Sequence, residues 1–239
     1  MLLGRADSFA VLAGTTVTNT GSSVITGDVG VFPGSSITGF PPGSVNGTIH
    51  TTDTAAGVAQ IDLAAAYTTI ALRAGAVDKS GTDLGGLTLM AGVYKFTSAA
   101  QLTGALTLSG PGEFDFQIGS TLTTASGSKV LLINGADSCN IFWQVGSSAT
   151  LGTTTAFEGN ILALTSITLN NGANILDGRA LARNGAVTLD TNNIDNRCVH
   201  SAAAVPVPGS FTLLGLGLAS LWAFRKKAGA ILGAVTLAR

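Results

Sequence analysis

Five threonines recur in one local setting, each directly after an apolar residue in a short β-prone stretch. They are Thr107, Thr123, Thr150, Thr168 and Thr188. Successive side chains of a strand point to opposite faces, so inward-pointing neighbours would place all five threonines outside. The positions two residues earlier hold only small side chains: Ala105, Thr121, Ser148, Ser166 and Ala186. Stacked strands of this kind would present a flat, regular, nearly uncharged surface of methyl and hydroxyl groups, and such a surface needs a function.

No residues in the sequence have the spacing of a catalytic or metal site. The histidines, His50 and His200, have no carboxylate or cysteine at triad or ligand spacing. Glu113 and Asp115 share a strand face, as glycosidase carboxylates would, but a solvated strand pair is the better interpretation. Arg179 suits acidic sugars, yet the calcium-binding carboxylates of pectin-cleaving β-helices are missing. We therefore expect no enzymatic activity, no metal and no cofactor.

The composition favours an extracellular β-protein over a cytosolic enzyme. Charged residues make up 10% of the 239-residue chain, against about 25% in ordinary soluble domains. The net charge of −1 gives no sign of the basic surface that nucleic-acid-binding proteins carry. Glycine is abundant, with 32 residues, and the mean hydropathy is +0.45. The length allows one large all-β domain.

Internal repeats indicate stacked turns of chain. Residues 116–123 match residues 143–150 at an offset of 27, and residues 163–169 resemble residues 182–189. The intervals from Thr150 to Thr168 and from Thr168 to Thr188 suit one coil of a three-sided β-helix with Asn-Gly or Asp-Gly corners. The same corners would also suit the hairpins of a β-sandwich. Repetition of one motif at coil length favours the mostly β, parallel solenoid.

One segment, residues 54–74, has the composition of a helix. It is rich in alanine, Thr52 or Asp53 is a candidate N-cap, and Gly75 is a candidate residue just beyond the C-cap. Such a helix would be about 31 Å long, and about six coils would rise to roughly 29 Å. We therefore expect one long α-helix packed along the solenoid.

The C-terminal part forms a separate unit. A short Pro-containing linker, residues 201–209, precedes the apolar run 210–224 and the basic cluster 225–227. A buried core helix is the alternative. The terminal position of the apolar run, the linker before it and the basic cluster after it favour a membrane or sorting segment within 210–239. Residues 228–239 have no evident role.

Cys139 and Cys198 are the only cysteines. In an extracellular protein such a pair favours one disulfide, which would tie the last strand to an earlier coil. Two buried thiols are the alternative.

Short motifs between residue 3 and about residue 195 carry a family resemblance. They are LG (3–4), SFAVLA (8–13), GDVGV (27–31) with Pro33, GVYKF (92–96), FQI (116–118), FWQVG (142–146), FEGNIL (157–162) and GRAL (178–181). Through them the chain resembles the ice-binding proteins that fold as an irregular right-handed β-helix with a parallel α-helix alongside.

The resemblance implies that one flat solenoid face binds the surface of an ice crystal. Positions equivalent to Thr123 and Thr188 belong to that face in the family. The resemblance also implies that the N-terminal coil stacks on the last coil, which would let Thr16 and Thr18 extend the same row. Inhibition of ice growth and recrystallisation would follow.

The C-terminal unit is similar to the PEP-CTERM sorting signal of exported bacterial proteins, with Val207 where that motif has glutamate. This implies a secreted or cell-surface protein that associates with membrane through residues 210–239. The family's signal peptide is expected to be missing or truncated, since only Met1 and Leu2 precede the first motif. We expect a monomer whose domain 1–200 binds ice. A structural or adhesive cell-envelope solenoid is the alternative.

Overall fold

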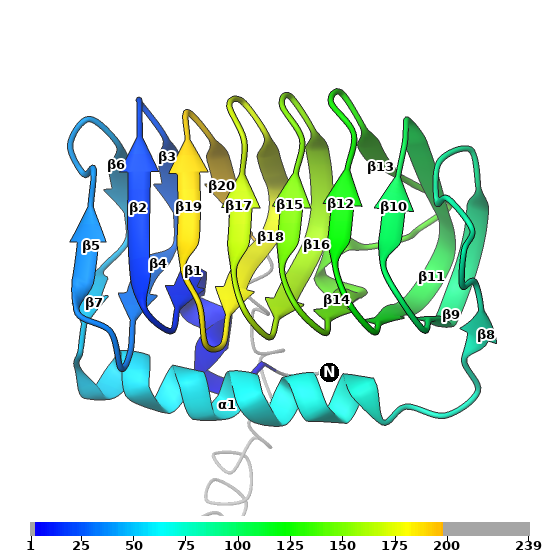
Figure 1. Cartoon of the computed structure of the whole chain (residues 1–239), viewed down its shortest axis with the longest axis horizontal. Coiled ribbons are helices and arrows are strands. Elements are labelled where there is room, and N and C mark those ends of the chain that lie inside the picture. Colours follow the sequence, from blue (N-terminus) through cyan, green and yellow to red (C-terminus); the bar gives the residue numbers. More distant parts are fainter. Residues whose placement is uncertain (1–2, 198–239) are drawn as a thin grey trace, which may run out of the picture. The chain divides into compact units, whose positions relative to one another are not determined.

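The computed structural model describes residues 3–197, and within them the fold is mostly β with a single α-helix. The expectations for Cys198, the linker and the apolar C-terminal segment lie outside the described residues. Figure 1 shows the strands side by side, with helix α1 running along them.

One of the two sheets has seven short strands of three to five residues each. In spatial order its strands are β10 (Ala100–Leu102), β12 (Leu122–Thr124), β15 (Ala149–Leu151), β17 (Ile167–Leu169), β19 (Val187–Asp190), β2 (Thr16–Thr20) and β5 (Ser36–Thr38). Every pair in it is parallel. The seven strands are one more than the six coils that the helix length predicts.

The other sheet contains the remaining thirteen strands. Its main path is β6 (Ser44–Asn46), β3 (Val24–Thr26), β20 (Asn193–Asp195), β18 (Asn174–Ala182), β16 (Ala156–Ala163), β13 (Lys129–Ile133), β11 (Ala105–Ile118), β9 (Thr88–Phe96) and β8 (Val77–Asp78). Strands β1 (Phe9–Ala13), β4 (Asp28–Val31), β7 (Ile49–Thr51) and β14 (Ile141–Val145) pair beside this path. Two short 3₁₀ helices, η1 (Gly4–Ser8) and η2 (Ser138–Asn140), complete the described elements.

The thirteen-stranded sheet holds two distinct ladders. Strand β11 pairs with β13 along residues 105–109 and with β14 along residues 114–118. The register of β9 against β11 shifts between Ser109 and Phe114, and that of β16 against β18 shifts between Phe157 and Gly159. The long strands therefore pass from one ladder to the other, and the seven-stranded sheet provides a third.

The spatial order of the strands differs from their order in the chain. Strand β1 pairs with β18, and β2 pairs with β19. The N-terminal strands therefore stack on the last ones, which confirms the expectation from the family resemblance.

The internal repeats are neighbours in the interior. Phe116 pairs with Trp143, and Ile118 pairs with Val145, which is the predicted offset of 27. The rings of Phe116 and Trp143 stack with centroids 3.8 Å apart, and Tyr94 lies 5.5 Å from Phe116 on the other side. Repetition in the sequence therefore becomes a column of like side chains in the core.

Helix α1 (Thr54–Ala71) begins as predicted and ends earlier than predicted. The Asp53 carboxylate caps it by accepting a hydrogen bond from the Ala56 amide at 2.9 Å. The amide of Arg73 bonds to the Ile70 carbonyl, which tightens the last turn. The prediction that Gly75 follows the C-cap was therefore wrong, since Leu72 is the C-cap.

The buried side of α1 packs on a row of outward side chains that changes from leucine to glutamine. Leu12, Leu181 and Leu162 pair in register and lie in one buried cluster with the helix. Gln144 and Gln117 continue the row. The Gln117 side-chain amide donates to the carbonyls of Ile70 and Arg73 at 2.7 and 2.9 Å, so it binds carbonyls at the end of the helix.

Arg73 ties the end of the helix to the sheet. Its guanidinium pairs with Asp115 and, at 2.8 Å, with Glu113. Asp115 is 1% exposed, and burial raises its pKa to about 6. The prediction of a solvated carboxylate pair was therefore wrong, because Arg73 covers it.

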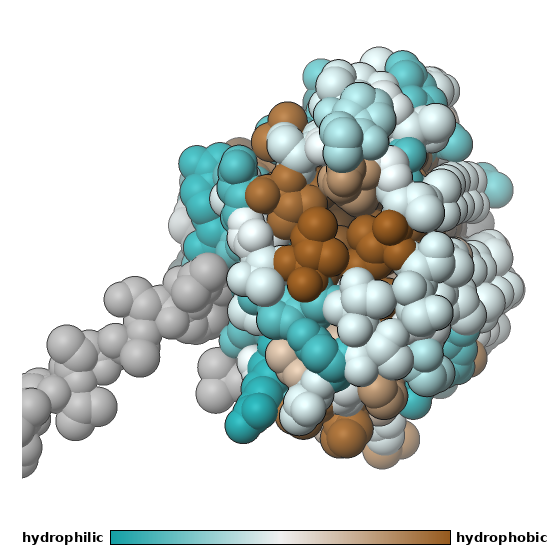
Figure 2. Space-filling model, turned by 90° about the vertical axis from the view of Figure 1, so that its left-hand side faces the viewer, coloured by the Kyte–Doolittle hydropathy of each residue, from teal (hydrophilic) through white to brown (hydrophobic). Residues whose placement is uncertain are grey.

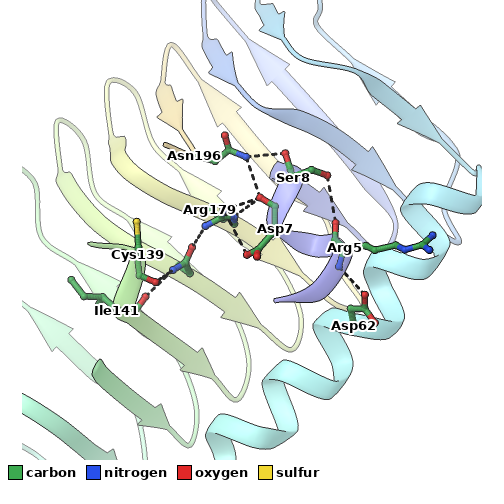
Figure 3. A network of polar contacts seen from close by, with 9 residues as sticks. Arg5, Asp7, Ser8, Asp62, Cys139, Ile141, Arg179 and Asn196 are labelled. Carbon is green, nitrogen blue, oxygen red and sulfur yellow. Dashed lines mark hydrogen bonds and ion pairs between the residues drawn. The ribbon is translucent and has the colours of Figure 1, made fainter. Parts of the chain in front are cut away.

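A buried arginine holds the N-terminal segment on the stack (Figure 3). Arg179 is 1% exposed and donates to the Asp7 carbonyl oxygen from Nε and Nη2, at 3.0 and 2.7 Å. Its Nη1 donates to Asn160 Oδ1 at 2.7 Å. Asn196 Nδ2 donates to the Ser8 carbonyl at 2.8 Å. This arginine is thus a structural link between η1 and β18 and is not available to an acidic sugar.

The stack ends in apolar side chains at strands β5, β6 and β7. Ile37, Val45 and Ile49 pair with the fully buried Val17, Ile25 and Val29, yet they remain partly exposed. Figure 2 looks onto this end and shows apolar residues gathered at its middle. Each of the three strands has a paired neighbour on one side only within the described chain.

Glu158 lies where β16 bends from one ladder to the next. Its carbonyl accepts a hydrogen bond from Trp143 Nε1 at 3.0 Å. Burial, and then the charge of Asp177, raise the pKa of its carboxyl to about 7. The native state therefore keeps this proton at pH values at which the unfolded chain loses it.

We predict that Glu158 makes the protein less stable as pH rises from about 4.5 to about 7, because a raised native pKa contributes stability below the unfolded value and loses it above the native one. Glu158→Gln should flatten this part of the stability profile. Denaturant unfolding at several pH values measures it, and an unchanged slope in the variant would contradict the assignment.

Candidate functional site

The outward threonines of the seven-stranded sheet form one row in register. Thr123 pairs with Thr150, Thr150 with Thr168, and Thr168 with Thr188. Thr188 pairs with Thr18, as predicted, and Thr18 pairs with Thr38. We call this set of six the threonine row. Strands in a ladder lie about 4.8 Å apart, so the row is about 24 Å long.

The side chains of the threonine row are accessible and sit on a closed core. Thr18, Thr38, Thr123 and Thr188 are exposed, whereas Thr150 and Thr168 are half-buried. The inward residues just before them in β2, β12, β15, β17 and β19 are at most 1% exposed: Val17, Leu122, Ala149, Ile167 and Val187. Within the described chain the six hydroxyls make no hydrogen bond to protein, so they remain available to water.

A second line of small residues lies two positions earlier on each strand. It contains the predicted Thr121, Ser148, Ser166, Ala186 and Thr16, all half-buried, together with the exposed Ser36. Ser148 Oγ accepts a hydrogen bond from the Ser166 amide at 3.3 Å, and Ser166 Oγ accepts one from the Ala186 amide at 3.2 Å. These bonds hold the hydroxyls of Ser148 and Ser166 beside the backbone.

Thr107 and Ala105 do not belong to this surface, and the prediction that they do was wrong. Strand β11 pairs Thr107 with Leu131 and Thr88 in the thirteen-stranded sheet. The position beside Thr123 is occupied by Gln101 of β10. Thr107 shares the pattern of an apolar residue, threonine and leucine with Thr150, Thr168 and Thr188, but that pattern also occurs on another side of the fold.

Ser36 and Thr38 were missed by the sequence reasoning. The tripeptide Ser36-Ile37-Thr38 is identical to Ser166-Ile167-Thr168. Thr38 also follows Thr18 at the same interval that separates Thr188 from Thr168. The shared tripeptide and the equal interval together indicate that β5 belongs to the seven-stranded sheet.

The threonine row and the line beside it contain no charged residue. No three His, Cys, Asp or Glu side chains between residues 3 and 197 are grouped to hold a metal ion. His50 instead contacts the helix cap, with Nδ1 2.7 Å from Asp53 Oδ2. What the surface offers is methyl and hydroxyl groups at fixed spacing.

Cys139 lies in η2, and no cysteine of the described chain is free. Its predicted partner, Cys198, lies outside the described residues, so the pairing remains a prediction.

The model of the ice-binding-like family matches residues 11–195. The chain belongs to this family. An ice-binding protein of Nostoc sp. (strain HG1) is 59% identical over 235 residues, which cover 95% of this chain and 87% of that protein. One from Flavobacterium frigoris (strain PS1) is 36% identical, covering 80% of this chain and 75% of that protein.

Solved structures of the ice-binding-like family share the fold. An ice-binding protein from an Antarctic biological consortium has a TM-score of 0.79 at 51% identity, covering 81% of this chain and 90% of that one. An ice-binding protein from the Antarctic ascomycete Antarctomyces psychrotrophicus has a TM-score of 0.79 at 44% identity, covering 82% of this chain and 97% of that one.

A PEP-CTERM protein-sorting motif matches residues 204–227, which confirms that part of the resemblance. Among residues 3–197 no helix has the length and apolar character needed to cross a membrane.

We predict that paired substitutions in β17 separate core from surface. Ile167→Ala leaves a cavity under the threonine row and should cost about 2–5 kcal/mol of unfolding free energy. Thr168→Ala removes an outward group and should cost about 0.5 kcal/mol or less. Denaturant unfolding measures both, and equal costs would mean that the strand is not oriented as described.

Proposed function

We propose that the protein binds ice through the threonine row and the line of small residues beside it. The observation that carries the proposal is the row itself: six threonines in register, uncharged, five of them directly after a fully buried core residue. Membership of the ice-binding-like family supports it. So do the ice-binding relatives, which cover most of this chain.

The mechanism rests on the regular spacing of water-ordering groups. A surface that binds ice must hold water near lattice positions without a large loss of entropy on contact. The ladder sets one repeat at about 4.8 Å, and alternate residues along each strand set another at about 7 Å. Threonine has few χ1 choices, so its methyl and hydroxyl are already placed before contact.

Charged groups would hold water in other geometries, and the threonine row contains none. The methyl groups discourage disordered hydration between the hydroxyls. Protein adsorbed in this way pins the ice front, and the pinned front resists further growth and recrystallisation.

In its finer detail the fold is proposed to be a right-handed, three-sided parallel β-solenoid. The three ladders support three sides, and α1 covers one of them. Of the two remaining sides, only the seven-stranded sheet carries the uncharged row. Lys129, Met90 and Leu131 are exposed on the other.

We also propose the domain plan and the location of the protein. Residues 1–200 form the ice-binding domain, with a Cys139–Cys198 disulfide at its end, and 201–209 form a linker to the segment 210–239. The sorting motif at residues 204–227 supports export, followed by secretion or anchoring at the cell surface. The domain acts as a monomer without catalysis.

An adhesive cell-envelope protein is the rival function. Threonine is common in exposed strands because of its β-propensity alone, and a repetitive face can also bind polymers. The two functions differ in whether one bulky side chain on the row abolishes adsorption to ice.

We predict that Thr150→Tyr abolishes most thermal hysteresis and most partition into growing ice, because the ring lifts the surface away from the lattice. Thr107→Tyr is the matched control. Both threonines follow a small or apolar residue, precede leucine and are half-buried, but Thr107 lies in the thirteen-stranded sheet. It should keep full activity. Melting temperatures of both variants show whether the fold is intact.

Full activity in Thr150→Tyr with loss in Thr107→Tyr would move the site to the other sheet. If the unmodified protein itself does not partition into ice, the adhesive function is preferred.

We predict that protein truncated after Ser201 keeps both its melting temperature and its ice activity, since the family match ends at residue 195. Calorimetry and thermal hysteresis measure the two properties. Failure to fold or loss of activity would place the C-terminal segment within the ice-binding domain.

A further inference from the structure

Gln101 occupies the position at which the threonine row would continue. Strand β10 pairs with β12 over all three of its residues, and the register sets Gln101 beside Thr123. The residues before and after it, Ala100 and Leu102, are at most 1% exposed, whereas Gln101 is exposed. The strand is thus oriented like the six others, and only its outward residue differs.

Asp83 lies beyond Gln101 on the same side. The two residues form an isolated parallel bridge. Asp83 is exposed, and its Oδ1 accepts hydrogen bonds from the amides of Gly85 and Thr103 at 2.7 and 2.9 Å. These bonds fix a carboxylate directly past the glutamine, so the surface beyond β12 is polar and charged.

The opposite end of the row differs. There the row runs to Thr38 on β5, the last strand of the sheet, and Ser36 continues the line beside it. The row therefore stops at one end because the sheet stops. At the other end it stops one strand earlier, because β10 presents a different side chain.

From this difference we propose that Gln101 sets the length of the ice-binding face. The inference rests on the proposed function of the threonine row. A glutamine side chain is longer than threonine, has three rotatable bonds, and carries both a donor and an acceptor. It therefore holds water above the plane of the threonines and loses rotamer freedom if an ice surface approaches.

No hydrogen bond joins the Gln101 side chain to the described part of the protein, so its replacement removes no internal hydrogen bond. Threonine suits an exposed strand position. Gln101→Thr would lengthen the row from six threonines to seven without changing the ladder.

The experiment compares the thermal hysteresis of wild type, Gln101→Thr, Gln101→Ala and Lys129→Thr at equal concentration. Gln101→Thr should raise thermal hysteresis by roughly one sixth, because the row grows from six threonines to seven at one ladder spacing each. Gln101→Ala, which removes the amide without adding a hydroxyl, should fall between wild type and Gln101→Thr.

Lys129→Thr is the control, because it places a new threonine on an exposed strand of the other sheet. It should leave activity unchanged. An equal gain in Lys129→Thr would overturn the inference, since the gain would then be unrelated to the face.

The outcome is read together with Thr150→Tyr. If Thr150→Tyr abolishes activity while correctly folded Gln101→Thr equals or falls below wild type, the face stands and the role of Gln101 is refuted. If Thr150→Tyr keeps full activity, the proposed function of the row itself fails.

Discussion

The parallel backbone ladder is the constraint on which the rest of this structure depends. Backbone hydrogen bonds fix the distance between neighbouring strands, whatever side chains the strands carry. A row of threonines is therefore regular only because the ladder beneath it is regular. The column of Tyr94, Phe116 and Trp143 in the core has the same origin. One backbone repeat thus sets both the packing inside and the pattern outside.

Two arginines join separate segments of the chain away from the threonine row. Arg73 binds two acidic side chains at the end of α1, and Arg179 holds the N-terminal segment. Each of these carboxylates or carbonyls would be costly to bury without its partner. Neither arginine lies on the threonine row, which contains no charged residue.

Much of the fold followed from sequence because the ladder turns spacing into contact. Thr123, Thr150, Thr168 and Thr188 follow one another at coil length, and the ladder places them side by side. The prediction that Thr107 lies in the row was wrong. The interval from Thr107 to Thr123 is shorter than the interval between any two successive threonines of the row. The true neighbour, Gln101, lies further back in the chain, one full turn before Thr123. The prediction that Asp115 is solvated was wrong for another reason. Its partner Arg73 lies 42 residues away in the chain, and no pattern in the sequence indicates that the two residues meet.

The place of the first strands in the stack has a consequence for how the chain folds. Thr20 and Leu189, which are hydrogen-bonded, are 169 residues apart in sequence. Strands β1 and β2 have their neighbours β18 and β19 only after nearly the whole domain has been synthesised. Their other neighbours, β4 and β5, follow closely in the chain, so the N-terminal strands can pair with these early but gain β18 and β19 only at the end. Such non-local pairing folds slowly, and until it is complete the earliest strands have exposed edges that other chains could pair with.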